Sequence, residues 1–248
     1  ANTTGADNTA VGKGSADALT TGNYNTALGA GSLGASTTAS NNTALGFTAL
    51  AGSASGEDNT AVGYKALNAT TTGANNTAVG LDALLANTTG ASNTAVGQKA
   101  LDANTTADAN VAVGKDALGA NTTGASNVAV GAYSLDAATT ATDNTAVGYA
   151  SLGAATTGGS NVAMGKGALE KNTTGTTNVA IGAGAMVENL TTSNNTALGY
   201  YALKVNVAAN NTAVGASALA ANTTGASNVA VGKGSLTACT TGATNVAV

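Results

Sequence analysis

The 248-residue sequence contains no histidine, no proline and a single cysteine, and it has few charged residues. The absence of histidine removes the commonest general base and the commonest metal ligand. Charged residues make up 8% of the chain, against about 25% in ordinary soluble domains, and the formal net charge is −4. The sequence therefore offers no basic surface for nucleic acid or for an anionic membrane.

Other absences narrow the fold class. No run of about 20 apolar residues is present, so we expect no membrane insertion. Cys239 has no partner for an intramolecular disulfide, and we interpret it as a tolerated small residue. The lack of proline suits a chain whose backbone N–H groups are committed to a continuous hydrogen-bond ladder. Disorder is not expected, because apolar residues make up 43% of the chain and occupy fixed positions.

An internal repeat is the dominant feature of the sequence. An asparagine recurs every 17 residues up to Asn195, and after one deletion the series resumes at Asn211, Asn228 and Asn245. Each asparagine opens the phrase Asn-(Thr/Val)-Ala-(Val/Leu/Ile/Met)-Gly. A period this short indicates a stacked array, because no single repeat can bury its own apolar face. We call each repeat a coil and number its positions 1 to 17 from the asparagine.

The alternation within one coil predicts a short strand at positions 1 to 5, ended by glycine. Positions 2 and 4 share one side of that strand and position 3 faces the other. We expect positions 2, 4 and 9 to fill the interior, which buries Val62, Val79 and Val96 together with Leu67, Leu84 and Leu101. The variable positions 6 and 7 should be exposed, as at Tyr64, Lys65, Gln98 and Lys99.

These patterns predict an all-β fold, a parallel β-solenoid of the β-roll or β-helix type with one 17-residue repeat per coil. Residues 1–248 then form a single repetitive segment of about fifteen coils. The chain begins and ends inside a repeat, so we expect both terminal caps to be missing and the segment to belong to a longer fibre. The thin core of each coil favours several chains wrapping together, as in a homotrimeric fibre.

Three finer expectations follow from the repeat. The position-1 asparagines should stack as an amide ladder. The small residues at positions 3 and 8 either save space in a narrow coil or form a seam between neighbouring chains. The shortened coil between Asn195 and Asn211 should keep its strand in register and absorb the deletion in a loop.

The phrase Asn178-Val179-Ala180-Ile181-Gly182 resembles the head repeat of trimeric autotransporter adhesins, Asn-Ser-Val-Ala-Ile-Gly. The longer run from Asn59 to Leu67, followed by Thr71-Thr72-Gly73, is similar to repeats of bacteriophage tail-fibre and bacterial surface-fibre proteins. The resemblance covers essentially the whole chain. It implies a homotrimer of parallel β-coils, located outside the cell or on a virion, that serves reach and adhesion. The adhesin heads differ in using shorter repeats.

The sequence predicts no catalytic, cofactor-binding or metal-binding residues. Gly29-x-Gly31-x-x-Gly34 matches a dinucleotide fingerprint but lies in an ordinary coil without βαβ context. The carboxylates are scattered over several positions, and no calcium-roll repeat is present. Sequons of the form Asn-x-Thr arise from the repeat itself, at Asn87, Asn104, Asn121, Asn172 and Asn222.

The leading interpretation is a fibre shaft that sets reach and stiffness, self-associates and gives weak multivalent attachment, with the receptor-binding region outside this segment. The alternative is an ice-binding solenoid that uses two stacked files of the Thr-Thr pair at positions 13 and 14. A third possibility is a solenoid that binds or hydrolyses carbohydrate on its flank. Sugar-processing β-helices need clustered acids and usually aromatic platforms, whereas this chain has only seven aromatic residues, confined largely to the exposed tip at positions 6 and 7. We therefore expect no enzymatic activity.

Overall fold

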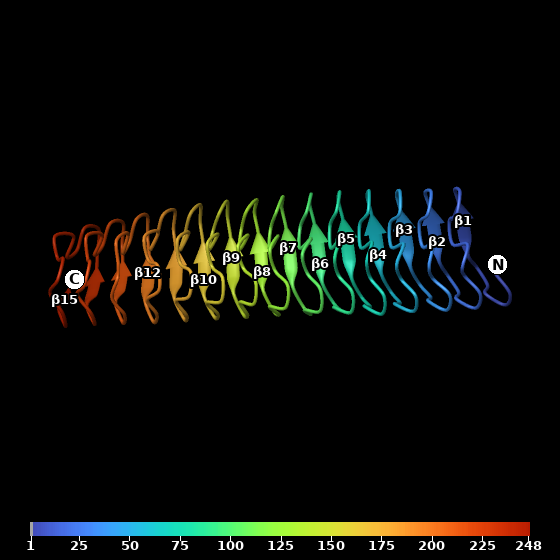
Figure 1. Ribbon diagram of the computed structural model, residues 1–248. Coiled ribbons are helices and arrows are strands. Elements are labelled where there is room, and N and C mark those ends of the chain that lie inside the picture. The colour runs from blue at the N-terminus through green and yellow to red at the C-terminus, as the bar shows by residue number, and fades with distance from the viewer. Residues whose placement is uncertain (1) are drawn as a thin grey trace. The chain divides into compact units, whose positions relative to one another are not determined.

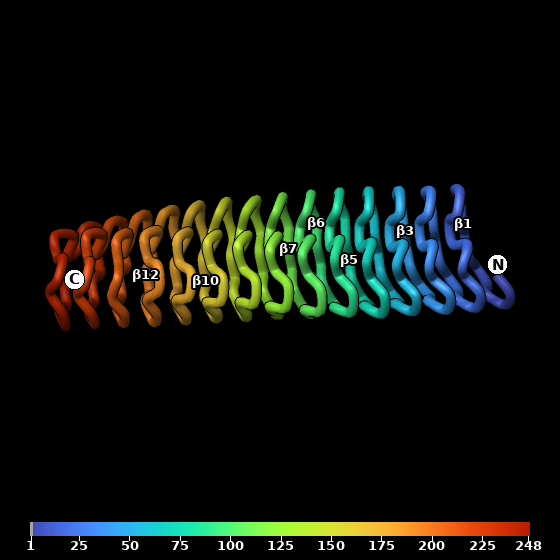
Figure 2. Tube along the Cα trace, viewed as in Figure 1, coloured from blue at the N-terminus to red at the C-terminus, as the bar shows by residue number. Residues whose placement is uncertain are grey.

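The computed structural model describes residues 2–248 as a parallel β-solenoid that divides into two compact units, Ala1–Ser126 and Asn127–Val248. Within each unit the coils follow one another in chain order (Figures 1 and 2). Each coil contributes one short strand. Unit 1 holds β1(Thr9–Val11), β2(Thr26–Leu28), β3(Thr43–Leu45), β4(Thr60–Val62), β5(Thr77–Val79), β6(Thr94–Val96) and β7(Val111–Val113). Unit 2 holds β8(Val128–Val130), β9(Thr145–Val147), β10(Val162–Met164), β11(Val179–Ile181), β12(Thr196–Leu198), β13(Thr212–Val214), β14(Val229–Val231) and β15(Val246–Ala247).

The strands pair in parallel with their equivalents in the adjacent coils of the same unit. Thr60 of β4 pairs with Thr77 of β5, for example, and Ala61 pairs with Ala78. The loops are paired in the same way: the Leu67 amide donates to the Ala83 carbonyl, and the Thr71 amide to the Thr88 carbonyl. Proline lacks this donor, so its absence fits a backbone that is hydrogen-bonded from coil to coil.

The interior of each coil is lined by positions 1, 3, 8, 9 and 12. Leu67, Leu84 and Leu101 have no exposed surface, as predicted. The position-3 alanines of β2 to β14 are fully buried as well. The core of a typical coil is therefore a leucine, two small residues at positions 3 and 8, the position-1 asparagine and, in most coils, a second polar side chain at position 12.

The prediction that position 4 lies in the interior is wrong. Val62 and Val79 are partly exposed, and Val96 keeps 37% of its surface in solvent. The reason is the asparagine at position 1, which is buried in the coils from Asn25 to Asn228. Side chains alternate along a strand, so a buried position 1 places position 3 inside and positions 2 and 4 outside.

The asparagine ladder is confirmed, and it uses the backbone as well as the side chain. Oδ1 of Asn76 accepts a hydrogen bond from the backbone N–H of Asn93 at 3.0 Å and from its Nδ2 at 3.2 Å. Nδ2 of Asn76 donates to the carbonyl of Gly90, fourteen residues later in the same coil, at 2.9 Å. Each amide therefore ties its own coil closed and joins it to the next one.

The stripes of small residues save space and do not form a seam. Position 3 faces the interior, and Ala66, Ala83 and Ala100 at position 8 are fully buried. An outward seam at these positions is thus excluded by the direction in which their side chains point. The interior has room for one leucine per coil, and a larger residue at position 3 would overpack it.

Two positions require unusual backbone. At position 5, a Cβ on Gly63 (φ 136°) would lie 2.5 Å from the carbonyl oxygen of Gly80 in the next coil, so only glycine fits. At position 9, Leu67 has φ 53°. A left-handed conformation costs an L-residue roughly 1–2 kcal/mol, while burial of a leucine contributes about 1.5–3 kcal/mol, so burial offsets the strain.

The shortened coil behaves as predicted. Thr196 of β12 pairs with Thr212 of β13, so the ladder continues with a spacing of sixteen residues. Asn206 keeps its place inside, where its Oδ1 accepts from Nδ2 of Asn222 at 3.0 Å. The missing residue is taken from the turn that follows, in which Nδ2 of Asn206 donates to the carbonyl two residues ahead, at Ala208.

Candidate functional surfaces

The outward side chains of positions 2 and 4 form an uncharged surface on each unit, which we call the sheet face. Position 2 is threonine or valine and position 4 is valine, leucine, isoleucine or methionine. Several position-4 side chains keep more than a third of their surface in solvent, among them Val11, Leu28, Leu45, Val96, Val113, Val147, Met164, Leu198 and Val231. No charged residue occurs at positions 1 to 5 of any coil.

The sheet face is a continuous exposed surface of moderate size. Seven strands about 4.8 Å apart, each with two outward side chains about 7 Å apart, give a strip of roughly 240 Å² in unit 1. That is somewhat smaller than the largest apolar patch on a typical monomer, and such largest patches are often functional. The sequence interpretation missed this surface, because it assigned positions 2 and 4 to the interior.

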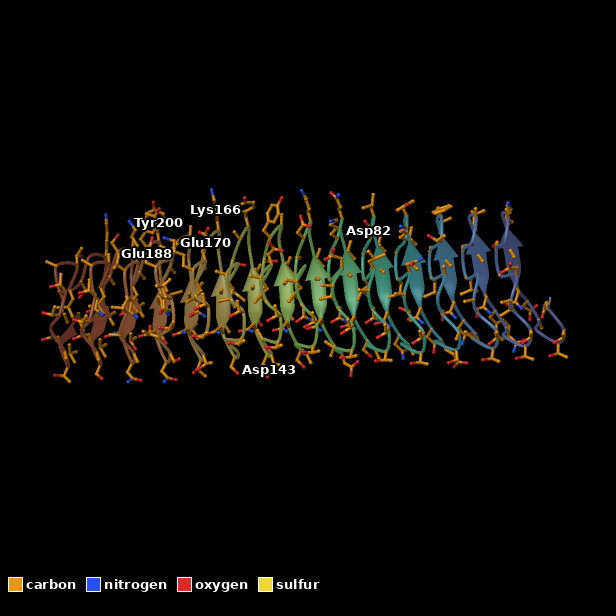
Figure 3. The ribbon with its side chains drawn as sticks, in the orientation of Figure 1. Asp82, Asp143, Lys166, Glu170, Glu188 and Tyr200 are labelled. Carbon is orange, nitrogen blue, oxygen red and sulfur yellow. The ribbon has the colours of Figure 1, made fainter. Side chains whose placement is uncertain are left out.

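Charge gathers at a different edge of the coil. All eight lysines lie at positions 6, 7, 10 or 11, together with seven of the twelve acidic residues; the other five acids lie at positions 16 and 17. Figure 3 shows Lys166, Glu170, Glu188 and Tyr200 of unit 2 at one edge, and Asp143 at the opposite edge. Positions 1 to 5 are thus uncharged, and we call the edge formed by positions 6, 7, 10 and 11, which carries all the lysines and most of the acids, the charged edge.

Six of the seven aromatic residues share the charged edge. In unit 1 the rings of Phe47 and Tyr64 stack with centroids 5.5 Å apart. In unit 2 Tyr133 meets Tyr149 edge-on at 5.8 Å, and Tyr200 lies 4.1 Å from Tyr201. A side-chain hydrogen bond with Tyr201 raises the pKa of the Tyr200 hydroxyl above its ordinary value of 10.0.

Two hollows lie side by side at this edge of unit 2. One, of about 350 Å³, is bounded by Tyr149, Lys166, Glu170 and Tyr200. The other, of about 470 Å³, lies between Tyr133 and Lys171 and shares Glu170 with the first. Lys171 also forms an ion pair with Glu188 at 2.6 Å. No sequence motif marks this arrangement, because its members come from separate coils.

The threonine pair at positions 13 and 14 does not present two equivalent files. Position 14 is exposed, as at Thr72 and Thr89, but position 13 is partly buried in most coils. The position-13 hydroxyls donate to the position-13 carbonyl of the next coil, as Thr88 does to Thr105 at 2.9 Å. Their geometry is therefore set by bonding within the solenoid, which leaves one outward file at this corner.

The sequon asparagines form a second interior ladder at position 12. Nδ2 of Asn104 donates to Oδ1 of Asn87 at 2.8 Å, and Nδ2 of Asn121 donates to Oδ1 of Asn104 at 3.0 Å. These side chains are fully buried, which agrees with an origin in the repeat. Residues 2–248 contain no group of three potential metal ligands, and the same residues include no helix suited to crossing a membrane.

No protein-family model and no curated protein sequence matches this chain. The resemblance to fibre repeats therefore stays an expectation, and any functional conclusion depends on the surfaces described above.

Proposed function

We propose that this chain is a structural shaft segment of an extracellular or virion adhesion fibre, and that copies of it associate through the sheet face. The observation that carries the proposal is the exposed, uncharged strip at positions 2 and 4, which recurs in every coil. A solenoid grows by adding coils that contact only their neighbours, so such a segment sets reach and stiffness. It carries no enzymatic role in this proposal, and its receptor is bound by regions outside the segment.

A second and a third copy of this chain are the partners that suit the sheet face. Its side chains repeat every 4.8 Å or so along the coil axis, and another copy in parallel register presents the same repeat. Because the strip carries no charge, packing two strips together leaves no ion desolvated and unpaired. We propose a homotrimer in which three sheet faces surround a common axis.

The area of the sheet face sets how strongly copies associate. The roughly 240 Å² of unit 1 falls short of the 800 Å² or so per partner of a standard interface. Association should therefore strengthen with the number of coils, which is the behaviour expected of a fibre assembled along its length.

The test introduces lysine on the sheet face. The triple variant V62K/V79K/V96K places three charges at partly exposed positions, so each chain can still fold, but association would desolvate those charges. Gln98→Lys is the matched control, because lysine already occupies position 6 at Lys115 and Lys166. Analytical ultracentrifugation should give a trimer for the wild type and the control, and a monomer for the triple variant. A wild-type chain that sediments as a monomer at all concentrations contradicts the proposal.

Ice binding is the second candidate, and one observation favours it on the sheet face instead of at the Thr-Thr pair of positions 13 and 14. The position-2 side chains of β1 to β6 are six consecutive threonines, Thr9, Thr26, Thr43, Thr60, Thr77 and Thr94, on the uncharged sheet face. A rigid file of methyl and hydroxyl groups at regular spacing is a surface that could order water. Thermal hysteresis that is strong in the wild type and lost in a Thr60→Lys/Thr77→Lys variant would promote this candidate over self-association, since both roles need the same face.

A further inference from the structure

The 350 Å³ hollow at the charged edge of unit 2 lies where two side chains are missing. The Asn161 and Asn178 coils have glycine at position 7, whereas other coils place residues such as Lys99 there. A Cβ on Gly184 would collide with the ring of Tyr201, and one on Gly167 would lie 2.9 Å from Oε2 of Glu170. The glycines therefore form the floor of the 350 Å³ hollow, over which Tyr201 and Glu170 lean.

Aromatic rings stand at both ends of the two hollows. Tyr149 and Tyr200 border the first and are 52% and 56% exposed, and Tyr133 borders the second. Tyr149 and Tyr200 belong to coils three steps apart, which corresponds to about 14 Å along the coil axis. We call the two hollows together the tyrosine groove.

The charges around the tyrosine groove are balanced. Three lysines and three acids lie in it or beside it: Lys166, Lys171, Lys204, Asp136, Glu170 and Glu188. Lys166 lies 5.9 Å from the Tyr149 ring centroid and Lys204 lies 5.0 Å from that of Tyr201. A groove with no net charge selects neither an anion nor a cation, but its carboxylates and ammonium groups can accept and donate hydrogen bonds.

Exposed aromatic rings combined with balanced hydrogen-bonding groups fit a sugar. The faces of pyranose rings carry polarised C–H groups, which the negative face of an aromatic ring attracts, while the hydroxyl groups at the rim require donors and acceptors. The groove is open and elongated, so it suits an extended chain of sugars better than a single ring.

We propose that the tyrosine groove binds a neutral polysaccharide laid along the coil axis of unit 2. Tyr149 and Tyr200 stack against sugar rings, and the Glu170 carboxylate accepts hydrogen bonds from hydroxyl groups between them. This site would give the segment a weak attachment of its own, repeated in every copy of the chain. The site depends on positions 6 to 11 and not on the sheet face. The polysaccharide proposal can therefore fail while the fibre proposal stands, and the fibre proposal can fail while the polysaccharide proposal stands.

The experiment titrates the full chain with three neutral probes, maltohexaose, cellohexaose and chitohexaose, by isothermal titration calorimetry. We expect at least one probe to bind with a millimolar dissociation constant. Tyr149→Ala should weaken binding about tenfold, the loss expected for one aromatic stack. The fold should tolerate this change, because Ala132 and Ala183 occupy the same position in other coils.

Matched controls distinguish an effect on the tyrosine groove from a general effect on the coil. Tyr24→Ala removes a tyrosine that is 63% exposed in unit 1, at a position held by alanine at Ala109, and should leave binding unchanged. Gly167→Lys should abolish binding by filling the floor. Gly14→Lys makes the same change in unit 1 at a similar φ, 67° against 64°, and should have no effect.

Three results would overturn the proposal. The first is the absence of binding by all three hexasaccharides up to about 20 mM, well above the expected dissociation constant. The second is an equal effect of Tyr149→Ala and Tyr24→Ala. The third is a preference for heparin, a polyanion, over every neutral probe, since that would assign the site to the lysines alone.

Discussion

Replacing Asn76 by alanine tests whether the buried asparagine ladder holds the coils together. Oδ1 of Asn76 is the acceptor for the backbone N–H of Asn93, and its Nδ2 donates to Gly90 and Asn59. The Gly90 carbonyl keeps a second donor, Nδ2 of Asn87 at 2.9 Å. Oδ1 of Asn59 keeps the Asn76 backbone N–H at 3.0 Å. Nδ2 of Asn93 loses its bond to Oδ1 of Asn76 but keeps the Ala107 carbonyl at 2.8 Å. The Asn93 backbone N–H is therefore the group that loses the acceptor shown for it.

The cost can be estimated from these bonds. A buried N–H without an acceptor costs about 1–3 kcal/mol, and the lost amide donation adds about 1 kcal/mol. We expect Asn76→Ala to destabilise the surrounding coils by about 2–4 kcal/mol. Asn75→Ala is the control: Asn75 is exposed at position 17, and alanine occupies that position at Ala109, so its effect should stay within about 0.5 kcal/mol.

Native-state hydrogen exchange is the suitable assay, because coils in an array can open locally without global unfolding. The Asn93 amide should exchange at least about tenfold faster in Asn76→Ala than in the wild type, since 1.4 kcal/mol corresponds to tenfold. Unchanged protection of Asn93 in Asn76→Ala would refute the reasoning. So would equal destabilisation by the two variants in urea.

Three further predictions concern single positions. Cys239→Asn should stabilise the chain by about 1 kcal/mol in urea unfolding, because the buried Oδ1 of Asn222 lacks a donor and Cys239 occupies the next ladder position; a loss of stability would contradict this. Leu101→Ala should cost about 2–5 kcal/mol, whereas Val96→Ala should cost little in the isolated chain but weaken association, and urea unfolding and sedimentation separate the two effects. Burial raises the pKa of the Asp102 carboxyl above its ordinary 3.8, so the folded chain binds the carboxyl proton more tightly than the unfolded chain does. The chain therefore loses stability as the pH rises from 3.8 through the higher pKa of the folded state. Asp102→Asn should therefore stabilise at pH 7, with an advantage that disappears below pH 3.8; an advantage independent of pH would count against it.

The repeat, the strand and the leucine core could all be predicted from the sequence, because each depends on periodicity. Which side of the strand faces the interior could not be predicted from hydrophobicity. Burying Val79 and exposing Ala78 follows the usual preference for valine in a core, yet the structure does the reverse. The asparagine at position 1 indicates which side of the strand faces inward. Hydrogen bonds between side-chain amides are strongest when they are buried away from water, so position 1 lies inside and alternation places position 3 inside as well. Variation pointed the same way, since position 3 is always alanine while position 4 has four residue types.

The tyrosine groove was beyond reach of the sequence for a different reason. Tyr149, Glu170 and Tyr200 are separated by 21 and 30 residues, and only the stacking of coils brings them around one hollow. Glu170 and Tyr200 lie at one edge of unit 2 in Figure 3. The exposure of most aromatic residues, at positions 6 and 7, could be predicted from the repeat. Which of them become neighbours could not, because that depends on the stacking of coils along the coil axis.

The interior and the surface of this solenoid follow different rules, and this difference explains where specificity can arise. Positions 1, 3 and 5 are uniform because each meets the same constraint in every coil. Position 1 joins the amide ladder, position 3 lies in the narrow interior, and at position 5 the backbones of adjacent coils approach closely. Positions 6, 7, 10 and 11 contact solvent and can change one coil at a time at little cost to the fold. Deleting side chains at Gly167 and Gly184 between tyrosine-bearing coils creates a groove without disturbing a single ladder bond. A uniform solenoid can acquire a local binding site in this way, when glycine replaces larger side chains at its edge.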